Sequence, residues 1–197
     1  MSLQDQKKWD AKYLRKSELL KPREASKILM HYAVNGKGMK ALDLACGAGR
    51  NSIYLAQEQY EVDAVDIAEI ALNALRVDAS KQGLAEYITP LLQDLDNYIP
   101  SREVYDIIVM SNFLDRALLE RTKEGLKRGG LYIVETYMDD MNNEKQDSKA
   151  NNLLKKEELK SLFSDGYDLI HYNEFENEAY EIYRMKKQVI VVMKQLE

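Results

Sequence analysis

The stretch Ala41-Leu-Asp-Leu-Ala-Cys-Gly-Ala-Gly-Arg-Asn-Ser-Ile-Tyr54 decides the fold of this chain. The apolar run 39–45 predicts a buried strand, the small residues of 47–49 predict a tight turn, and 51–59 predicts a helix. Glycine allows a positive φ and a close ligand approach, and the start of a helix presents unpaired N–H groups at the same point. The order of strand, glycine turn and helix therefore predicts a nucleotide-binding corner.

The residues of this corner separate two classes of ligand. A dinucleotide fingerprint needs G-x-G-x-x-G, but Ser52 stands where its third glycine would be. An acid, Asp43, lies inside the strand, four residues before Gly47. A carboxylate suits the sulfonium and ammonium cations of S-adenosylmethionine (SAM) better than it suits a pyrophosphate. The corner therefore favours SAM over a dinucleotide.

Length and composition are those of one ordinary globular domain. The chain has 197 residues, of which 45% are hydrophobic and 31% are charged. Its apolar runs are far shorter than the ~20 residues of a membrane span, and no secretory pattern opens it. A single cysteine, Cys46, excludes an internal disulfide. We therefore expect a cytoplasmic protein without a membrane partner.

Charge is spread unevenly along the chain. The net charge is 28 − 33 = −5, whereas residues 1–40 carry ten Lys and Arg against four Asp and Glu, which gives +6. This basic arm is either a solvated helical face or a lid that brings positive charge to an active site. The acidic remainder makes nucleic acid an unlikely partner, because a broad nucleic-acid footprint needs a clustered basic patch.

Hydrophobic periodicity predicts alternating helices and strands. We expect helices over 3–17, 22–36, 51–59, 68–82, 115–127 and 155–163, and strands over 39–45, 61–67, 87–92, 104–111, 131–136, 167–172 and 188–194. Alternation predicts parallel βαβ units with right-handed crossovers. The last two strands have no helix between them, which predicts an antiparallel hairpin. The long polar segment 137–152 suggests a functional loop.

The chain resembles the class I SAM-dependent methyltransferases, most closely the small tellurite-resistance and thiopurine-type group. The segments that carry the resemblance are Trp9-Asp-Ala-Lys-Tyr13, Asp43-Leu-Ala-Cys-Gly-Ala-Gly-Arg-Asn51, Val65-Asp-Ile67, Gln93-Asp-Leu95 and Leu126-Lys-Arg-Gly-Gly130. The chain departs from the family pattern at Ala45, where many members have glycine, and at Arg128, where they have proline. The resemblance implies an α/β, Rossmann-like, doubly wound seven-stranded sheet of order 3-2-1-4-5-7-6 with strand 7 antiparallel. It also implies one domain over 1–197, with an N-terminal helical lid over 1–38.

The resemblance further implies a set of cofactor-binding residues and no metal. They are Trp9, Tyr13, Asp43, Ala45, Gly47, Gly49, Asn51, Asp66, Ile67, Asp94, Leu95 and Ser111. Among them, Asp66 would bind both ribose hydroxyls. Asp94 would bind the adenine amino group or serve turn chemistry, and Asn51 is a ligand contact or a helix cap. The pair Trp9 and Tyr13 belongs either to a lid or to the core.

The expected activity is methyl transfer from SAM to a small molecule such as a thiol, a metalloid oxyanion or an amine. No catalytic residue is assigned. The two histidines, His31 and His171, lie outside the expected strand-end loops, so we expect an acceptor that arrives already ionised or with a lone pair. Two alternatives stay open, an RNA or protein methyltransferase and a SAM-binding protein without catalysis.

Overall fold

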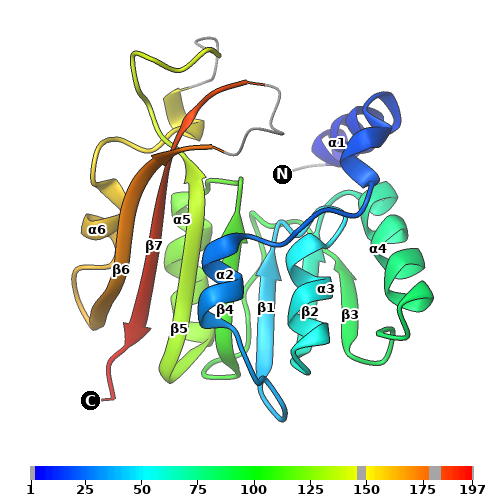
Figure 1. Ribbon diagram of the computed structural model, residues 1–197, viewed down its shortest axis with the longest axis horizontal. Helices are drawn as coiled ribbons and strands as arrows, with labels where there is room; N and C mark the ends of the chain where they lie inside the picture. The colour runs from blue at the N-terminus through cyan, green and yellow to red at the C-terminus, as the bar shows by residue number, and fades with distance from the viewer. Residues whose placement is uncertain (1–2, 146–149, 178–182, 197) are drawn as a thin grey trace.

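Seven strands form one mixed sheet in the order β3-β2-β1-β4-β5-β7-β6 (Figure 1). The computed structural model describes residues 3–145, 150–177 and 183–196. The strands are β1 Lys40–Leu44, β2 Glu61–Asp66, β3 Ile88–Leu92, β4 Tyr105–Ser111, β5 Leu126–Tyr137, β6 Tyr167–Glu176 and β7 Lys186–Lys194. The first five strands pair in parallel, and β7 runs antiparallel to both β5 and β6. The predicted strand order and the antiparallel seventh strand are confirmed.

Helices cover both faces of the sheet and give three layers. They are α1 Leu3–Arg15, α2 Lys27–Tyr32, α3 Arg50–Gln57, α4 Glu69–Lys81, α5 Arg116–Thr122 and α6 Glu158–Leu162, with 3-10 turns η1 Ser17–Leu20, η2 Lys123–Gly125 and η3 Ala150–Asn152. One core contains side chains of α2, α3 and α4, and the other contains side chains of α5 and α6. Within the described residues, no helix is long and apolar enough to cross a membrane.

The helix expected over 22–36 is shorter than predicted. It begins at Lys27 and ends at Tyr32, because Ala25 and Ser26 are extended and buried against the sheet. The backbone N–H of Ser26 donates to the side chain of Asn51 at 3.0 Å. A long-range hydrogen bond therefore takes the place of the first helical turn expected at Pro22.

The boundary between α5 and β5 also differs from the prediction. The helix expected to reach Lys127 ends at Thr122, and β5 begins at Leu126 rather than at Leu131. The reason is pairing with the chain before β4, where Val104 N–H donates to the carbonyl of Gly125 at 2.9 Å. Residues 126–130, which the sequence placed at the end of the helix and in the connection to the next strand, are therefore the first part of β5.

The carboxyl ends of the parallel strands meet at one edge of the sheet. At this edge the strand order reverses between β1, which pairs with β2, and β4, which pairs with β5. Open α/β sheets bind ligands at such a switch point. In Figure 1 this edge is at the top, where α1 and the chain that follows β5 also lie. Most of the cofactor-binding residues expected from the sequence come from the strand ends and turns at this edge.

Candidate functional site

The turn after β1 requires positive φ at three positions. Ala45, Gly47 and Gly49 have φ of 53°, 57° and 81°. A Cβ added at Gly49 would lie 2.2 Å from Cδ1 of Leu75 on α4, and one at Gly47 would lie 2.9 Å from the hydroxyl oxygen of Tyr13 on α1. The two glycines therefore let both helices approach the turn closely. Ala45 adopts the same left-handed backbone conformation although it carries a side chain.

Asp66 closes this turn from the end of β2. Its Oδ2 accepts from Gly47 N–H at 2.7 Å, and its Oδ1 accepts from Ala68 N–H at 2.8 Å. Burial raises the pKa of Asp66, while the two backbone hydrogen bonds act in the opposite direction. Because each carboxylate oxygen has two lone pairs, Asp66 can still accept a hydrogen bond on each oxygen from a ligand.

Asp43 lies fully inside the corner, on β1. It is 1% exposed, and the Ser52 hydroxyl donates to its Oδ2 at 2.6 Å. Burial raises the pKa of Asp43 to about 7, against the lowering effect of the Ser52 hydrogen bond. A buried carboxyl with this pKa gains or loses its proton close to neutral pH, and a nearby cation would favour its charged form.

A chain of hydrogen bonds, here called the polar relay, runs from β4 to β7. It consists of Ser111, Asn51, Ser26, Glu135 and Lys187. Asn51 Nδ2 donates to Ser111 Oγ at 3.1 Å, and Ser26 N–H donates to Asn51 Oδ1 at 3.0 Å. Ser26 Oγ donates to Glu135 Oε2 at 2.6 Å, and Lys187 Nζ donates to Glu135 Oε1 at 3.3 Å. The relay links the expected site residues Asn51 on α3 and Ser111 on β4 to the ends of β5 and β7.

The helix-cap interpretation of Asn51 is wrong. The N-cap of α3 is Gly49, which makes no side-chain cap, and Asn51 lies two residues further on in the first turn. Its side chain is 3% exposed and bonds to Ser26 and Ser111. Asn51 therefore joins Ser26 to Ser111 by hydrogen bonds and does not cap its own helix.

The N-terminal helix α1 lies over the corner and α4. Asp10 Oδ1 accepts from Ile70 N–H at 3.0 Å, so an acid of α1 satisfies the first turn of α4. Tyr13 reaches the glycine turn, and burial followed by the charge of Asp66 raises the pKa of its hydroxyl. Trp9 is half-buried, with its ring 6.4 Å from that of Tyr13 and Lys12 Nζ 4.0 Å above it. Tyr13 therefore lies against the glycine turn and Trp9 lies beside Tyr13, and their role toward a cofactor stays a prediction.

Of the three residues expected at the adenine ring, one is engaged in a turn and two are buried. Asp94 accepts from Asp96 N–H at 2.9 Å and from Asn97 Nδ2 at 3.3 Å, which is turn chemistry. Leu95 is 1% exposed within the core beside α5, and Ile67 is 7% exposed. Ile67 therefore offers a ligand more surface than Leu95 does, and the adenine role of Asp94 stays a prediction.

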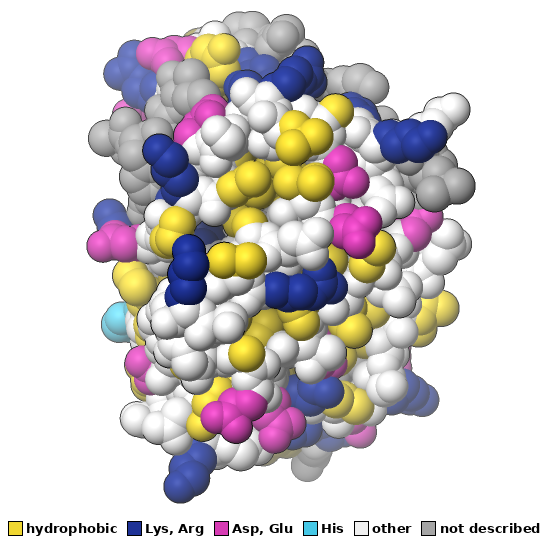
Figure 2. Space-filling model, turned by 90° about the vertical axis from the view of Figure 1, so that its right-hand side faces the viewer, with side chains coloured by type: hydrophobic (Ala, Val, Ile, Leu, Met, Phe, Trp, Pro, Cys, Tyr) yellow, Lys and Arg dark blue, Asp and Glu magenta, His cyan; other side chains and the backbone are white. Residues whose placement is uncertain are grey.

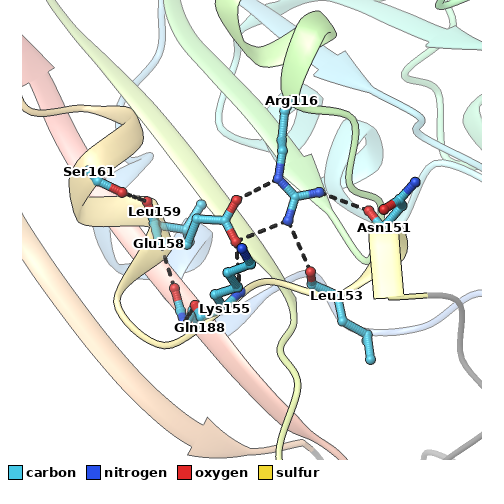
Figure 3. Close-up of polar contacts among 8 residues, drawn as sticks. All are labelled: Arg116, Asn151, Leu153, Lys155, Glu158, Leu159, Ser161 and Gln188. Atoms are coloured by element: carbon cyan, nitrogen blue, oxygen red, sulfur yellow. Dashed lines mark hydrogen bonds and ion pairs between the residues drawn. The ribbon is translucent and has the colours of Figure 1, made fainter.

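The chain after β5 is held against the sheet edge by Arg116 (Figure 3). Its guanidinium binds both carboxylate oxygens of Glu158 on α6. It also donates to the carbonyls of Asn151 at 2.8 Å and Leu153 at 3.0 Å. This bidentate contact lowers the pKa of Glu158. The expected functional loop 137–152, whose residues 146–149 lie outside the described part, is therefore fixed at its far end.

The two histidines lie on α2 and β6. His31 is exposed on α2, and His171 lies on β6 opposite Val191. Among residues 3–145, 150–177 and 183–196, no group of three His, Cys, Asp or Glu side chains could hold a metal ion.

Sequence reasoning missed three members of the polar relay, Ser26, Glu135 and Lys187. Each is at most 8% exposed. A signal was present, since Glu135 interrupts the apolar strand that contains Ile133 and Val134. A charged residue near the end of a buried strand is rare unless it is paired, but the sequence does not say which residue pairs with it.

Comparisons with known proteins agree with this geometry. The family model for the tellurite resistance protein TehB matches residues 4–190. A probable SAM-dependent methyltransferase TehB of Haemophilus influenzae is 34% identical over 102 residues, which are 48% of this chain and 35% of that protein. The ribosomal RNA small subunit methyltransferase C of Alcanivorax borkumensis is 27% identical over 106 residues, 50% of this chain and 33% of that protein. The chain thus matches about one third of the length of these curated relatives.

Solved structures support the same fold. The crystal structure of TehB from Haemophilus influenzae has a TM-score of 0.71 at 24% identity, covering 85% of this chain and 60% of that one. A SAM-dependent methyltransferase from Methanosarcina mazei has a TM-score of 0.69 at 18% identity, covering 89% of this chain and 100% of that one. The fold is that of the class I methyltransferases. With the family model matching almost all of its length, the chain belongs to the family of the tellurite resistance protein TehB.

Proposed function

We propose that this chain is a SAM-dependent methyltransferase that acts on a small-molecule acceptor. The observation that carries the proposal is Asp66 at the end of β2, bonded to the glycine turn and still able to accept hydrogen bonds on both oxygens. Family membership supports the same activity, and relatives of this chain are named as SAM-dependent methyltransferases.

The residues at the corner fit SAM chemically. The absence of a side chain at Gly47 lets the Tyr13 hydroxyl lie against the turn, since an added Cβ would fall 2.9 Å from its oxygen. Asp66 would accept from the ribose hydroxyls, and Asp43 would face the ammonium group as an anion. Ser111 would donate toward the carboxylate at the β1–β4 switch point. When bound, SAM supplies an electrophilic methyl group, and the protein contributes orientation, which accounts for up to ~7–11 kcal/mol of barrier in well-aligned reactions.

Residues 1–38 are proposed as the lid of this site. The proposal is supported by α1, whose Tyr13 reaches the glycine turn and whose Asp10 binds the start of α4. Lys12 lies close enough to Lys8, Lys16 and Lys145 for their charges to lower its pKa, although burial is the larger cause. This positive charge at the site edge would attract an anionic acceptor.

We further propose that the acceptor arrives as a nucleophile without help from a base. Neither His31 nor His171 lies at the carboxyl ends of the parallel strands. A thiolate, a metalloid oxyanion or an unprotonated amine would fit such a site, and an unactivated alcohol would not.

A ribosomal RNA acceptor is the second candidate, because one relative is named as an rRNA methyltransferase. The charge distribution favours the small molecule. Basic and acidic side chains alternate over the face that carries α1 and α4 (Figure 2), and the net charge is −5. An RNA footprint needs a continuous basic surface.

The test begins with calorimetric titration of SAM and S-adenosylhomocysteine into the wild type, Asp66→Asn and Asp78→Asn. Asp78 is a matched control, an acid on α4 whose Oδ1 accepts from Nε2 of Gln82, the residue that follows the helix, at 3.1 Å. Asp66→Asn should weaken binding by roughly ten- to a hundredfold, because hydrogen bonds to a charged group are worth ~1.5–3 kcal/mol, and Asp78→Asn should change nothing. Equal affinities in all three proteins would contradict the ribose role of Asp66.

The acceptor is then sought with labelled SAM across thiols, amines, hydroxyl compounds, metalloid oxyanions and ribosomal RNA. The value of kcat/KM should follow, as the pH changes, the fraction of each acceptor that is in its nucleophilic form, the anion for thiols and oxyanions and the unprotonated base for amines. A best substrate among unactivated alcohols, or a fixed pKa shared by all acceptors, would contradict the absence of a base. Transfer to RNA alone would select the second candidate, and cofactor binding without transfer to any acceptor would indicate a non-catalytic protein.

A further inference from the structure

A buried ion pair lies at the ends of β5 and β7, behind the proposed cofactor site. Glu135 is 8% exposed and Lys187 is 1% exposed, with Nζ 3.3 Å from Oε1. The Lys187 ammonium also lies 4.9 Å from the centre of the Tyr137 ring. Desolvating two charges costs several kcal/mol per ion, so a buried pair is weak evidence for stability alone. The contacts of Glu135 with the polar relay suggest what else the pair does.

The pair sets the direction of the hydrogen bonds that reach Ser26. Lys187 can only donate, and an ionised Glu135 can only accept. The Ser26 hydroxyl must therefore be the donor in its hydrogen bond to Glu135 Oε2, at 2.6 Å. This contact holds Ser26 in the extended chain before α2, where its backbone N–H points to Asn51.

The same logic extends from Ser26 to β4. A backbone N–H is only a donor, so the oxygen of the Asn51 amide must face Ser26 and its nitrogen must face Ser111. Asn51 Nδ2 therefore donates a hydrogen bond to Ser111 Oγ. The hydroxyl hydrogen of Ser111 stays available for a hydrogen bond to another acceptor. Ser111 is half-buried at the end of β4, at the switch point of the sheet.

We propose that Glu135 is a positioning residue that, through Ser26 and Asn51, holds the Ser111 hydroxyl as a donor toward the carboxylate of the ligand's amino-acid moiety. The proposal rests on the proposed function, since it takes SAM and its product as the ligands. With the ligand bound, the Ser111 hydroxyl would face the carboxylate of its amino-acid moiety, and the acid Asp43, bonded to Ser52 on the β1 side, would face its ammonium. Glu135 itself touches neither group.

Two ligands separate this role from a general effect on the fold. S-adenosylhomocysteine carries the amino-acid moiety, and 5′-methylthioadenosine has the same nucleoside and thioether without it. In Glu135→Gln, the new side chain keeps its oxygen toward Lys187 and turns its NH₂ toward Ser26, whose hydroxyl then has to accept instead of donate. The contact keeps no charge assistance, and this weaker, reversed hydrogen bond loosens the relay. Affinity for S-adenosylhomocysteine should fall roughly ten- to a hundredfold, the loss expected for a charge-assisted hydrogen bond. Affinity for methylthioadenosine should stay within about twofold of the wild type, because the nucleoside side is untouched.

The matched control is Asp106→Asn, at the amino end of β4. Asp106 accepts from Lys127 Nζ and from Lys40 N–H, each at 2.8 Å, so its loss breaks a partly buried pair at the opposite edge of the sheet. It should leave the affinities for both ligands unchanged. Equal losses for both ligands in Glu135→Gln, or no loss for either, would overturn the positioning role. Failure of the wild type to bind either ligand would instead overturn the proposed function.

A second variant keeps the test valid if the loss of the negative charge beside Lys187 prevents Glu135→Gln from folding. In Glu135→Gln with Lys187→Met, no ammonium competes for the amide oxygen, which can again accept from Ser26. The double variant should regain the affinity for S-adenosylhomocysteine to within about threefold of the wild type. A double variant that unfolds like the wild type and still binds S-adenosylhomocysteine weakly would overturn the directional argument.

Discussion

The two sides of the proposed site are built from interactions of different range. On the β1–β2 side, Asp66 bonds to backbone N–H groups 2 and 19 residues away, and Asp43 bonds to Ser52, 9 residues away. On the β5–β7 side, the Ser26–Glu135 contact spans 109 residues. The first side is a product of one local βαβ unit, whereas the second exists only when the whole sheet has assembled.

This difference predicts where substitutions act. Changes on the local side should disturb backbone geometry and therefore stability directly. Changes on the distant side should disturb how loops and side chains are held against the sheet. The three predictions below run from the largest expected effect to the smallest.

The largest effect is expected at Gly49, where the local side depends on close packing. In Gly49→Ala the new Cβ would fall 2.2 Å from Leu75 Cδ1, at a φ of 81°. Left-handed backbone costs ~1–2 kcal/mol for an L-residue and overpacking adds ~1–3 kcal/mol. We expect a loss of roughly 2–5 kcal/mol in unfolding free energy, measured by urea denaturation.

Gly83→Ala is the control for this prediction. Gly83 has a φ of 70°, and a Cβ added there meets nothing within 4 Å. Gly83→Ala therefore introduces the strain of a left-handed backbone but no steric overlap, so the unfolding free energy should fall by about 1–2 kcal/mol. Equal losses at the two glycines would show that close packing of α4 against the turn contributes nothing.

The second prediction concerns how the unfolding free energy depends on pH through Asp43. Its pKa is about 7 in the folded chain, against 3.8 as the ordinary value. Between these pH values the unfolded chain releases a proton that the folded chain keeps, so unfolding free energy falls as pH rises through this window. Asp43→Asn removes the effect, and the stability of the variant relative to the wild type should rise by roughly 2–4 kcal/mol between pH 4 and pH 8. Parallel stability curves for the two proteins over this range would contradict the raised pKa of the buried Asp43 carboxyl.

Arg116 tests the distant side. Arg116→Met leaves the carboxylate of Glu158 and the carbonyls of Asn151 and Leu153 without the guanidinium (Figure 3). Because the Arg116 side chain is 34% exposed, water can hydrogen-bond to some of the groups that the guanidinium leaves. We expect the unfolding free energy, measured by chemical denaturation, to fall by about 2–3 kcal/mol.

The control for Arg116 is Lys160→Met, which removes an exposed ion pair with Glu157 on the same segment. Exposed pairs contribute little, so this loss should stay below ~0.5–1 kcal/mol. If the two variants lose the same stability, Arg116 is not the anchor of the chain after β5.

Much of the architecture could be predicted from the sequence. Alternating periodicity predicted the parallel units, the missing helix between the last two strands predicted their antiparallel pairing, and the family resemblance added the strand order; all three are confirmed. Local patterns suffice for such elements because period and turn chemistry act over a few residues. The glycine turn and Asp66 were predicted for the same reason, since the turn and the acid belong to one βαβ unit.

The tertiary structure decided the features that depend on distant partners. The start of α2 moved to Lys27 because Ser26 bonds to Asn51 and Glu135. β5 began at Leu126 because the chain beside Gly125 pairs with Val104. Asn51 serves the polar relay rather than its own helix for the same reason. A polar group buried at a strand end must find a partner, and sequence shows that need without showing which residue, 109 positions away along the chain, will meet it.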